Sequence, residues 1–562
     1  MALATAGGKE TTKNGGSMKG NSYLAPGDDL PPLLRGGLQI SWPKRTPQTM
    51  SQNPAGLAAT ERSPLAVLGR FWRLLMAWFQ AVFAKLGGKR TDASDPNLVS
   101  LSDGSQLLSG RSGSGGDGSY TMEDLPPEVL ARVLALVPAR QLAQCSAVCR
   151  LWRQVAAADS LWERHWERDE KGYEAGPYAE KYLRLGRRAI SAHPPPLPPR
   201  LQTFAARCQL PRCVVVDAGS GYCKYGWSEQ LRPQGTVPTF LEFGNIESPT
   251  LPRLKKLYSA VFNSLGAKAP QQPVIISEPL CYNADPEASR QQRRSFRQMT
   301  CEVLFDKLKV PAICSVDQAF LALTAAQMRS GIVVNIGFRN TTILPVLNGR
   351  PLRPLTSGLL ALGAMRLTTV LSDLMDRAHL HYMSMFTVRT IKEELCYVAQ
   401  NYDEEMDKPL TKASCDVRGE GVFDLDQQRF QAPEILFQPA LCGSPQEEGL
   451  AQLVATCMEK CAKVPVADPE DAGWFQNVLL MGGSACIPGL PERLQKDVTS
   501  LVPSNLRSHV RVIPPTHGPH APWFGAKVIS NLSTMPGAWC ITREQYHKLG
   551  MDFVHAMSCD DD

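Results

Sequence analysis

An apolar strand that runs into a small-residue turn, VVVDAGSGYCKYG at residues 214–226, constrains the fold of this chain more than any other segment. Three consecutive valines predict a buried strand, Asp217 ends it, and a tight turn leads to a returning strand that carries Lys224. Glycines let backbone N–H groups approach an anion, serine can donate, lysine neutralises phosphate charge, and aspartate can hold a hydrated divalent cation. The hairpin predicts a phosphate site formed by Asp217, Gly219, Ser220, Gly221 and Lys224, with a plain glycine-turn hairpin as the alternative.

Several later motifs follow this hairpin in a characteristic order. GIVVNIGFRNTT at 331–342 has the same strand-and-turn build, and NVLLMGGSACIPG at 477–489 is an apolar strand that ends in a glycine pair. The remaining landmarks are PAICSVDQAFLAL (311–323), TIKEELCYVA (390–399), FQAPEILFQP (430–439) and WCITREQY (539–546). In this order and at these spacings they resemble actin and the actin-related proteins over residues 213–562. The resemblance implies an α/β fold of two related domains, each a mixed sheet with helices, in the ribonuclease H-like arrangement that closes on a nucleotide.

The composition limits the classes of partner and site. A chain of 562 residues is too long for one core, and its net charge of +6 is too mild to indicate a nucleic acid or a membrane as a direct partner. Its sixteen cysteines include no C-x-x-C pair, which argues against a zinc module or a secreted disulfide framework and favours a reducing compartment. The sequence also lacks G-x-x-x-x-G-K-[ST], H-E-x-x-H and EF-hand motifs, so only enzyme classes that carry such motifs are excluded.

The first 120 residues are predicted to contain one ordered element. Residues 1–63 are rich in Gly, Ser, Pro, Thr and Lys and are predicted to be a disordered tail, and residues 89–120 a flexible linker. Residues 64–88 predict an amphipathic helix, with Arg70 and Arg73 on one side and Phe71 and Phe79 on the other. Three interpretations stay open: docking on a protein surface, lying on a membrane surface through residues 65–86, or spanning a membrane, against which its charged residues argue.

Residues 121–169 predict a small helical module. The prolines of LPPEVL suit a helix start, and the pattern LPPEVL…VL…VP…L…VCRLW…LW resembles the F-box. That resemblance implies docking onto the Skp1 adaptor of a cullin-based ubiquitin ligase, with a contact face formed by Leu125, Pro126, Val129, Leu130, Leu134 and Trp152. A module of this size needs a partner for stability, and packing on the large domain is the alternative. Residues 170–212, with the run PPPLPP, predict a stiff Pro-rich bridge.

The actin resemblance implies roles for individual residues. Beyond the first hairpin, it assigns positioning of the attacking water to Gln318 and a place in the second phosphate turn to Gly337. The pair that contacts adenosine and the glycine turn beneath the nucleotide correspond to Lys392, Glu393, Gly482, Gly483 and Ser484. ATP or ADP with Mg²⁺ is the cofactor that this set implies. The alternatives are that Gln318 only caps a helix and that the other residues persist because the fold needs them.

The second hairpin departs from the actin pattern D-S-G-D-G-V-T-H. Asn335 replaces the acid that orders metal-bound water, Phe338 and Arg339 replace an aspartate and a glycine, and Thr342 replaces a histidine. A positioned acid or donor is typically worth about 10²–10⁴ in rate, so the chain is predicted to have no catalytic residues, no resident metal site and no enzymatic activity. The Arg339 guanidinium stays a candidate substitute for the lost phosphate contacts.

Residues 227–272 are also shorter than the corresponding part of actin, whose insertion forms a small outer subdomain with a flexible tip loop. In its place, the segment FLEFGNIESPT at 240–250 contains Gly, Asn and Pro, which are typical of a short loop. Because the tip loop makes longitudinal filament contacts in actin, the domain at 213–562 is predicted not to form filaments.

An F-box ahead of a trimmed actin fold resembles the F-box-containing actin-related proteins of plants and green algae, as do the blocks TFLEFGNIESP, GIVVNIGF, LCYVA and PGAWCITR. The resemblance implies a non-catalytic adaptor that links an unknown substrate protein to a Skp1–cullin complex, in the nucleus, with the nucleolus as an open option, and in the cytoplasm. The alternative hypotheses are a nucleotide-gated scaffold that belongs to a chromatin complex and a slow ATPase.

Overall fold

The computed structural model describes residues 126–167, 176–186, 194, 196–239 and 250–557. The predicted tail, amphipathic helix and linker at 1–120 lie outside these residues, and so do Leu125 and residues 240–249. Among the helices that are described, none combines the length and the apolar character needed to cross a membrane.

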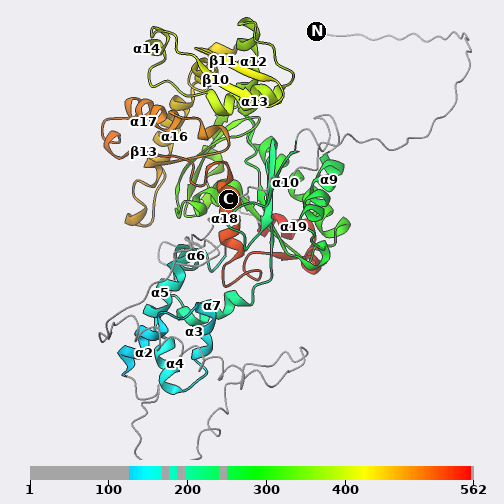
Figure 1. Ribbon diagram of the computed structural model, residues 1–562, viewed down its shortest axis with the longest axis vertical. Coiled ribbons are helices and arrows are strands. Elements are labelled where there is room, and N and C mark those ends of the chain that lie inside the picture. Colours follow the sequence, from blue (N-terminus) through cyan, green and yellow to red (C-terminus); the bar gives the residue numbers. More distant parts are fainter. Residues whose placement is uncertain (1–125, 168–175, 187–193, 195, 240–249, 558–562) are drawn as a thin grey trace, which may run out of the picture. The chain divides into compact units, whose positions relative to one another are not determined.

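Four short helices lie within the predicted F-box region: α2 (Pro127–Leu134), α3 (Ala139–Cys145), α4 (Arg150–Ala156) and α5 (Asp159–Glu167) (Figure 1). Pro127 occupies the first turn of α2, where its missing N–H removes no helical hydrogen bond. The helices enclose a small core that includes Leu130, Leu134 and Trp152, and the indole N–H of Trp162 donates to a backbone carbonyl of α4 at 2.7 Å. The module is therefore held by burial of one stripe of each helix.

The bridge at 170–212 contains two helices that the sequence analysis missed, α6 (Gly176–Tyr182) and α7 (Arg200–Cys208). The Tyr178 hydroxyl of α6 donates to the backbone carbonyl of Met328 at 2.7 Å. The buried Glu180 carboxylate accepts from the backbone N–H and the hydroxyl of Ser533, each at 2.7 Å, and burial raises the pKa of this carboxyl. Because α6 buries polar and aromatic groups against the large domain, this part of the bridge is an anchor and not an extended spacer.

Two mixed sheets form the large domain. The first contains β1 (Val214–Ala218), β2 (Tyr222–Trp227), β3 (Gly235–Pro238), β4 (Val274–Glu278), β5 (Ala312–Asp317) and β14 (Ile541–Thr542), in the order β14-β5-β4-β1-β2-β3. The second contains β6 (Gly331–Ile336), β7 (Thr341–Leu347), β8 (Arg350–Pro351), β9 (Ser357–Leu359), β12 (Asn477–Met481) and β13 (Arg511–Ile513), in the order β13-β12-β6-β7-β8, with β9 beside β7.

The two sheets repeat one pattern. In each, a hairpin (β1–β2 or β6–β7) also pairs through its first strand, in parallel, with a strand from later in the chain (β4 or β12). Every residue of β1 and β4 is buried, as expected of strands that are covered on both faces. Ligands in such sheets bind beyond the carboxyl ends of the parallel strands, which is where both hairpin turns lie.

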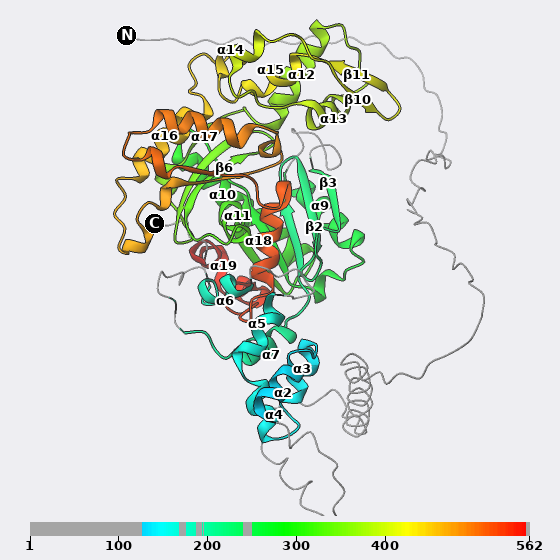
Figure 2. The same cartoon turned by 60° about the vertical axis from the view of Figure 1, so that its left-hand side comes forward.

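Helices complete both halves of the domain. They are α9 (Thr250–Ser264), α10 (Pro286–Cys301), the π-helical η3 (Glu302–Lys307), α11 (Gln318–Ala325), α12 (Ala364–Arg377), α13 (Met385–Leu395), α14 (Tyr402–Met406), α15 (Gln428–Glu434), α16 (Leu450–Cys461), α17 (Leu490–Leu501), α18 (Ala521–Ser530) and α19 (Arg543–Met557). Figure 2 shows α11 and α18 side by side. Every residue of α11 is buried, and this helix contributes to hydrophobic clusters of both sheets, so it joins the two halves.

A smaller layer carries the two-stranded sheet of β10 (Ala413–Val417) and β11 (Gly421–Leu425), which packs with α12, α13 and α15 (Figure 1). Its core includes Leu371, Val388, Ile391 and Phe423. This layer holds α13, and therefore Lys392 and Glu393, at the edge of the second sheet.

Candidate functional site

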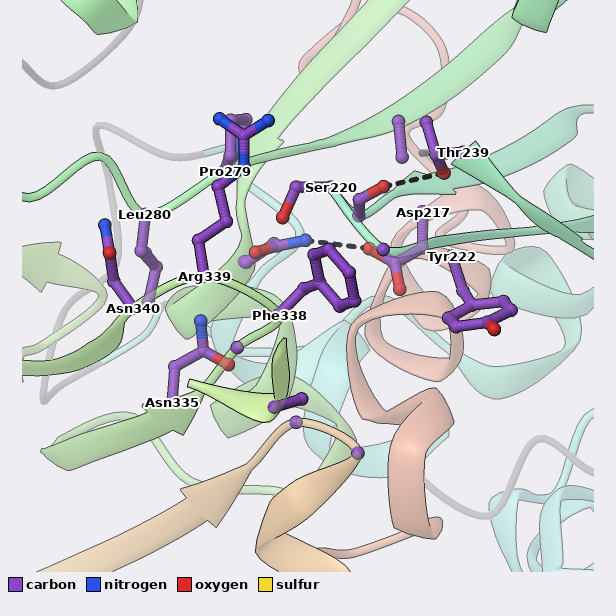
Figure 3. A pocket seen from close by; sticks show the side chains of 18 of the residues that line it. Asp217, Ser220, Tyr222, Thr239, Pro279, Leu280, Asn335, Phe338, Arg339 and Asn340 are labelled. Atoms are coloured by element: carbon purple, nitrogen blue, oxygen red, sulfur yellow. Dashed lines mark hydrogen bonds between the residues drawn. The ribbon is translucent and has the colours of Figure 1, made fainter. Parts of the chain in front are cut away.

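One cavity of about 910 Å³ is lined by all the residues that the sequence predicted for a nucleotide. They are Asp217, Gly219, Ser220, Gly221, Lys224, Gln318, Gly337, Lys392, Glu393, Gly482, Gly483 and Ser484. They come from the β1–β2 hairpin, the start of α11, the turns after β6 and β12, and α13. The fold thus assembles the predicted set from segments that are far apart in the sequence (Figure 3).

The carboxylate of Asp217 is the centre of a buried polar network in this cavity. Asp217 is 1% exposed and lies opposite Lys224 in the β1–β2 register, where the lysine Nζ is 3.1 Å from Oδ2. Oδ1 accepts from the Ser277 hydroxyl at 2.6 Å and from the Gln318 side-chain amide at 2.9 Å. A buried charge needs such partners. In this conformation the side chains of Lys224 and Gln318 are therefore bonded to the Asp217 carboxylate.

The turn of the second hairpin is fixed by backbone bonds. Gly337 N–H donates to Asn340 O at 3.1 Å, and the first N–H groups of α12, from Ala364 and Met365, donate to the carbonyls of Gly337 and Phe338 at 2.9 Å each. The N-terminal donors of α12, which are suited to an anion, are therefore used on the turn itself. In Figure 3 the Phe338 side chain points from this turn toward Asp217 and Tyr222 of the first hairpin.

The two residues predicted to contact adenosine make bonds within the chain. Lys392 is 5% exposed, and its Nζ donates to Ala364 O at 3.2 Å and to the Thr368 hydroxyl at 2.9 Å. Burial lowers the pKa of this lysine to about 8, and the Glu393 carboxylate opposes the shift. Glu393 itself accepts from Arg389 Nε at 2.7 Å.

The glycine turn after β12 approaches the second hairpin closely. Gly482 has a left-handed φ of +99°, and a Cβ at this position would collide with the carbonyl of Ile336. Gly483 has open space around it, and Ser484 is buried. The backbone geometry therefore requires a glycine at position 482, whether or not a ligand binds.

Four side chains that matter at the cavity were missed by the sequence reasoning: Ser277, Thr239, Tyr222 and Arg389. Thr239 donates its hydroxyl to Gly219 O at 2.8 Å and steadies the first turn. The Arg389 guanidinium stacks on the Tyr222 ring at 3.9 Å from the ring centroid, and so joins α13 to β2 across the cavity. Ser277 was detectable as a polar residue in the apolar run VIISE, but the other contacts depend on tertiary placement.

A Mg²⁺-bound nucleotide is the cofactor that this fold implies, and the phosphate end of the cavity does not fit it. Phe338 stands between the two hairpins whose turns were predicted to hold phosphate, and a Cβ built on Gly221 would be 2.6 Å from its ring. Asn335 offers no negative charge for a divalent cation. Lys224 and Gln318 are both bonded to Asp217.

The predicted F-box contact face divides into two groups. Leu130, Leu134 and Trp152 are almost completely buried, so the prediction that these three form a contact face is wrong for the folded module. They are instead its core, because they point toward the neighbouring helices. Pro126 and Val129 are exposed, and Leu125 lies outside the described residues.

A second apolar stripe runs one residue ahead of the buried one. Val129, Val133 and Leu136 have the spacing i, i+4, i+7, which keeps them on one side of α2 and the turn that follows it. Val129 is 42% exposed and Leu136 59% exposed. The module therefore buries the stripe that contains Leu130 and Leu134, and it leaves Val129 and Leu136 of the second stripe exposed to solvent.

Comparison with known proteins agrees with this architecture. The family model described as Actin matches residues 253–389 and 375–558. Actin-related protein 8 of Oryza sativa subsp. japonica is 43% identical over 433 residues, which cover 76% of this chain and 88% of the relative. Actin-related protein 8 of Arabidopsis thaliana is 42% identical over 428 residues, which cover 76% of this chain and 90% of the relative.

The chain belongs to the actin family. The predicted fold class and the resemblance to actin-related proteins of plants are confirmed. A model described as F-box-like matches residues 122–168 of this actin-family chain, and that class of domain indicates Skp1- and cullin-type partners in general. Nucleotide binding is common in the actin fold, so the misfit at the phosphate end is a property of particular residues and not of the fold.

Proposed function

We propose that this actin-family chain is a non-catalytic adaptor, whose F-box-like module docks on a Skp1-type subunit of a cullin ubiquitin ligase and whose actin-like body binds a substrate protein. The observation that carries the proposal is the apolar stripe of Val129, Val133 and Leu136, of which Val129 and Leu136 are exposed, on a module that matches the F-box-like model. Large apolar side chains that stay exposed beside a complete core are typical of a surface that a partner covers.

The stripe is large enough to contribute measurably to docking. Burial of a valine or leucine side chain is worth about 1.5–3 kcal/mol, so each aspartate substitution should weaken binding at least about tenfold. The Val129→Asp/Leu136→Asp variant should therefore lose retention on purified Skp1-type subunit. Gln141→Asp is the matched control, because it adds one negative charge at an exposed position of α3 without removing apolar surface.

The assay is a titration of full-length protein by isothermal calorimetry against the Skp1-type subunit, with circular dichroism of each variant to check that its helices are intact. The proposal expects binding by wild type and by Gln141→Asp, and loss of binding by the double variant. Absence of binding by wild type, or equal binding by all three proteins, would reject it. Fluorescence imaging of the tagged chain in plant cells tests the proposed nuclear and cytoplasmic distribution.

The competing hypothesis is a nucleotide-gated scaffold or slow ATPase that uses ATP or ADP with Mg²⁺. Asp217, Lys224 and Gln318 support it because they line the cavity, whereas Asn335 and Phe338 oppose it. Calorimetric titration with millimolar Mg-ATP tests this second hypothesis: absence of binding would reject it, whereas binding would leave the adaptor role to be decided by the Skp1 titration. A chromatin-complex role would be supported by co-purification with remodelling subunits. Filament formation is not part of the proposal.

A further inference from the structure

The Phe338 side chain touches the opposite hairpin at the position where close backbone approach matters most. A Cβ built on Gly221 would lie 2.6 Å from Cδ2, 2.7 Å from Cγ and 2.9 Å from Cβ of Phe338. Distances below 3.0 Å do not occur between real side chains, so the ring lies directly on the Gly221 backbone. An apolar group that belongs to the chain thereby occupies part of the space between the turns of the two hairpins.

The base of Phe338 is held as firmly as its ring is packed. Its carbonyl accepts from the N–H of Met365, and the preceding Gly337 is bonded to both Asn340 and Ala364. These bonds fix the turn to the first residues of α12. The turn that carries the ring is therefore bonded to the N-terminus of α12, which restricts movement of its backbone.

The charged groups beneath the ring have intramolecular partners as well. The carboxylate of Asp217 is bonded to Lys224, Ser277 and Gln318, so its charge is balanced without a cation. Phosphate would have to compete with Asp217 for Lys224, and it would have to displace the ring.

A second contact crosses the cavity between the same two halves. Arg389 of α13 stacks on Tyr222 of β2 at 3.9 Å, and its Nε is held by Glu393 at 2.7 Å. A stacked cation–aromatic pair of this kind is worth about 0.5–2 kcal/mol. The halves are thus tied at two places by side chains alone.

We propose that Phe338 takes the structural place of nucleotide phosphates in this chain, and that the two halves of its actin-like body stay closed on one another in the absence of nucleotide. The Arg389–Tyr222 pair reinforces the closure. The inference goes beyond the adaptor role and does not depend on it. Skp1 capture tests the F-box-like module, whereas the experiments below test the cleft of the actin-like body.

A double-mutant cycle on the full chain tests the contact. Gly221→Ala should lower the melting temperature by a few degrees, because its new Cβ meets the Phe338 ring, and φ at this glycine is not positive. In a Phe338→Ala background the ring is absent and only the Cβ contact at 2.9 Å remains, so the same substitution should lower the melting temperature clearly less. Gly219→Ala is the matched control: its Cβ would lie 2.7 Å from the carbonyl of Tyr222 and should be equally harmful in both backgrounds. Equal effects of Gly221→Ala in the two backgrounds would overturn the inference.

A nucleotide titration of wild type gives a second test that needs no variant. A ligand that binds only the folded state raises the melting temperature in proportion to the logarithm of its concentration. We expect no rise with millimolar Mg-ATP, Mg-ADP or Mg²⁺ with inorganic phosphate. A rise with Mg-ATP that adenosine does not reproduce would mean that phosphate enters the cradle, and it would overturn the inference while leaving the adaptor proposal intact.

Discussion

Lys392→Met should change how the stability of the protein depends on pH. The lysine ammonium is 5% exposed, and burial lowers its pKa from the ordinary value of 10.5 to about 8. Between these values the unfolded chain binds more protons than the folded one, so wild-type stability rises with pH across this window. Below the window the penalty is fully present and no longer changes with pH. The difference between the two pKa values corresponds to about 3 kcal/mol, an upper bound on the penalty at neutral pH.

The methionine carries no proton, so it removes this dependence. At pH 7.5 the variant is stabilised because no ammonium has to be desolvated on folding. It is destabilised by loss of the bonds to Ala364 and Thr368, which are worth about 1–3 kcal/mol together. Near pH 10 only the loss should remain. We therefore expect the stability difference, variant minus wild type, to fall by about 2–3 kcal/mol between these pH values.

Urea denaturation followed by tryptophan fluorescence at several pH values measures this difference, and Lys256→Met on the exposed side of α9 is the control. All other ionisable groups are the same in the wild type and the Lys392→Met variant, so their contributions to the stability difference cancel. A difference that stays constant from pH 7.5 to 10 would refute the reasoning, since it would mean that the Lys392 ammonium is not held in a desolvated site.

Two further substitutions test the core that supports the cleft. Arg297→Met should cost about 3–5 kcal/mol in urea denaturation, because it leaves the buried Glu278 carboxylate without the guanidinium that it contacts at 2.7 Å; a second substitution, Glu278→Met, should recover part of that loss. Gly525→Ala should prevent α18 from packing against α11, because the new Cβ would collide with the carbonyl of Leu321, whereas Gly483→Ala should remain soluble with a wild-type melting temperature. Equal solubility and melting of the two alanine variants would contradict this packing argument.

Sequence patterns predicted the local parts of the cleft well. The valine run before Asp217 and the glycine turns after each strand gave the hairpins, because burial and turn chemistry act over a few residues. Five of the twelve cavity residues were predicted from the first hairpin and the other seven by resemblance, and the fold brings all of them together. The sequence pattern does not predict the direction in which a side chain points across the cavity. Phe338 was identified as a departure from the family pattern, but its contact with Gly221 depends on the relative placement of the two sheets.

The helical module shows the same limit in a different way. Amphipathic spacing in α2 identifies two adjacent apolar stripes, and spacing alone does not say which one faces the core. The predicted face included Leu130 and Leu134, which are buried, and omitted Leu136, which is exposed. The bridge was misjudged for a related reason: its proline run suggested extension, while Glu180 and Tyr178 found partners that no local rule indicates.

The network around Asp217 changes what retained motif residues mean in this family. Asp217 is buried, so loss of Lys224 or Gln318 would leave a buried carboxylate with fewer partners, at a cost of about 1–3 kcal/mol or more for each bond. The presence of this acid, base and amide therefore does not by itself indicate hydrolysis, because stability alone is a sufficient reason to keep them. Asn335 carries no charge, so the identity of this position is expected to depend on whether a divalent cation is bound. The identity of positions such as 335 therefore indicates whether nucleotide chemistry is retained. In this chain, Asn335 favours an actin-like body that acts as a binding surface.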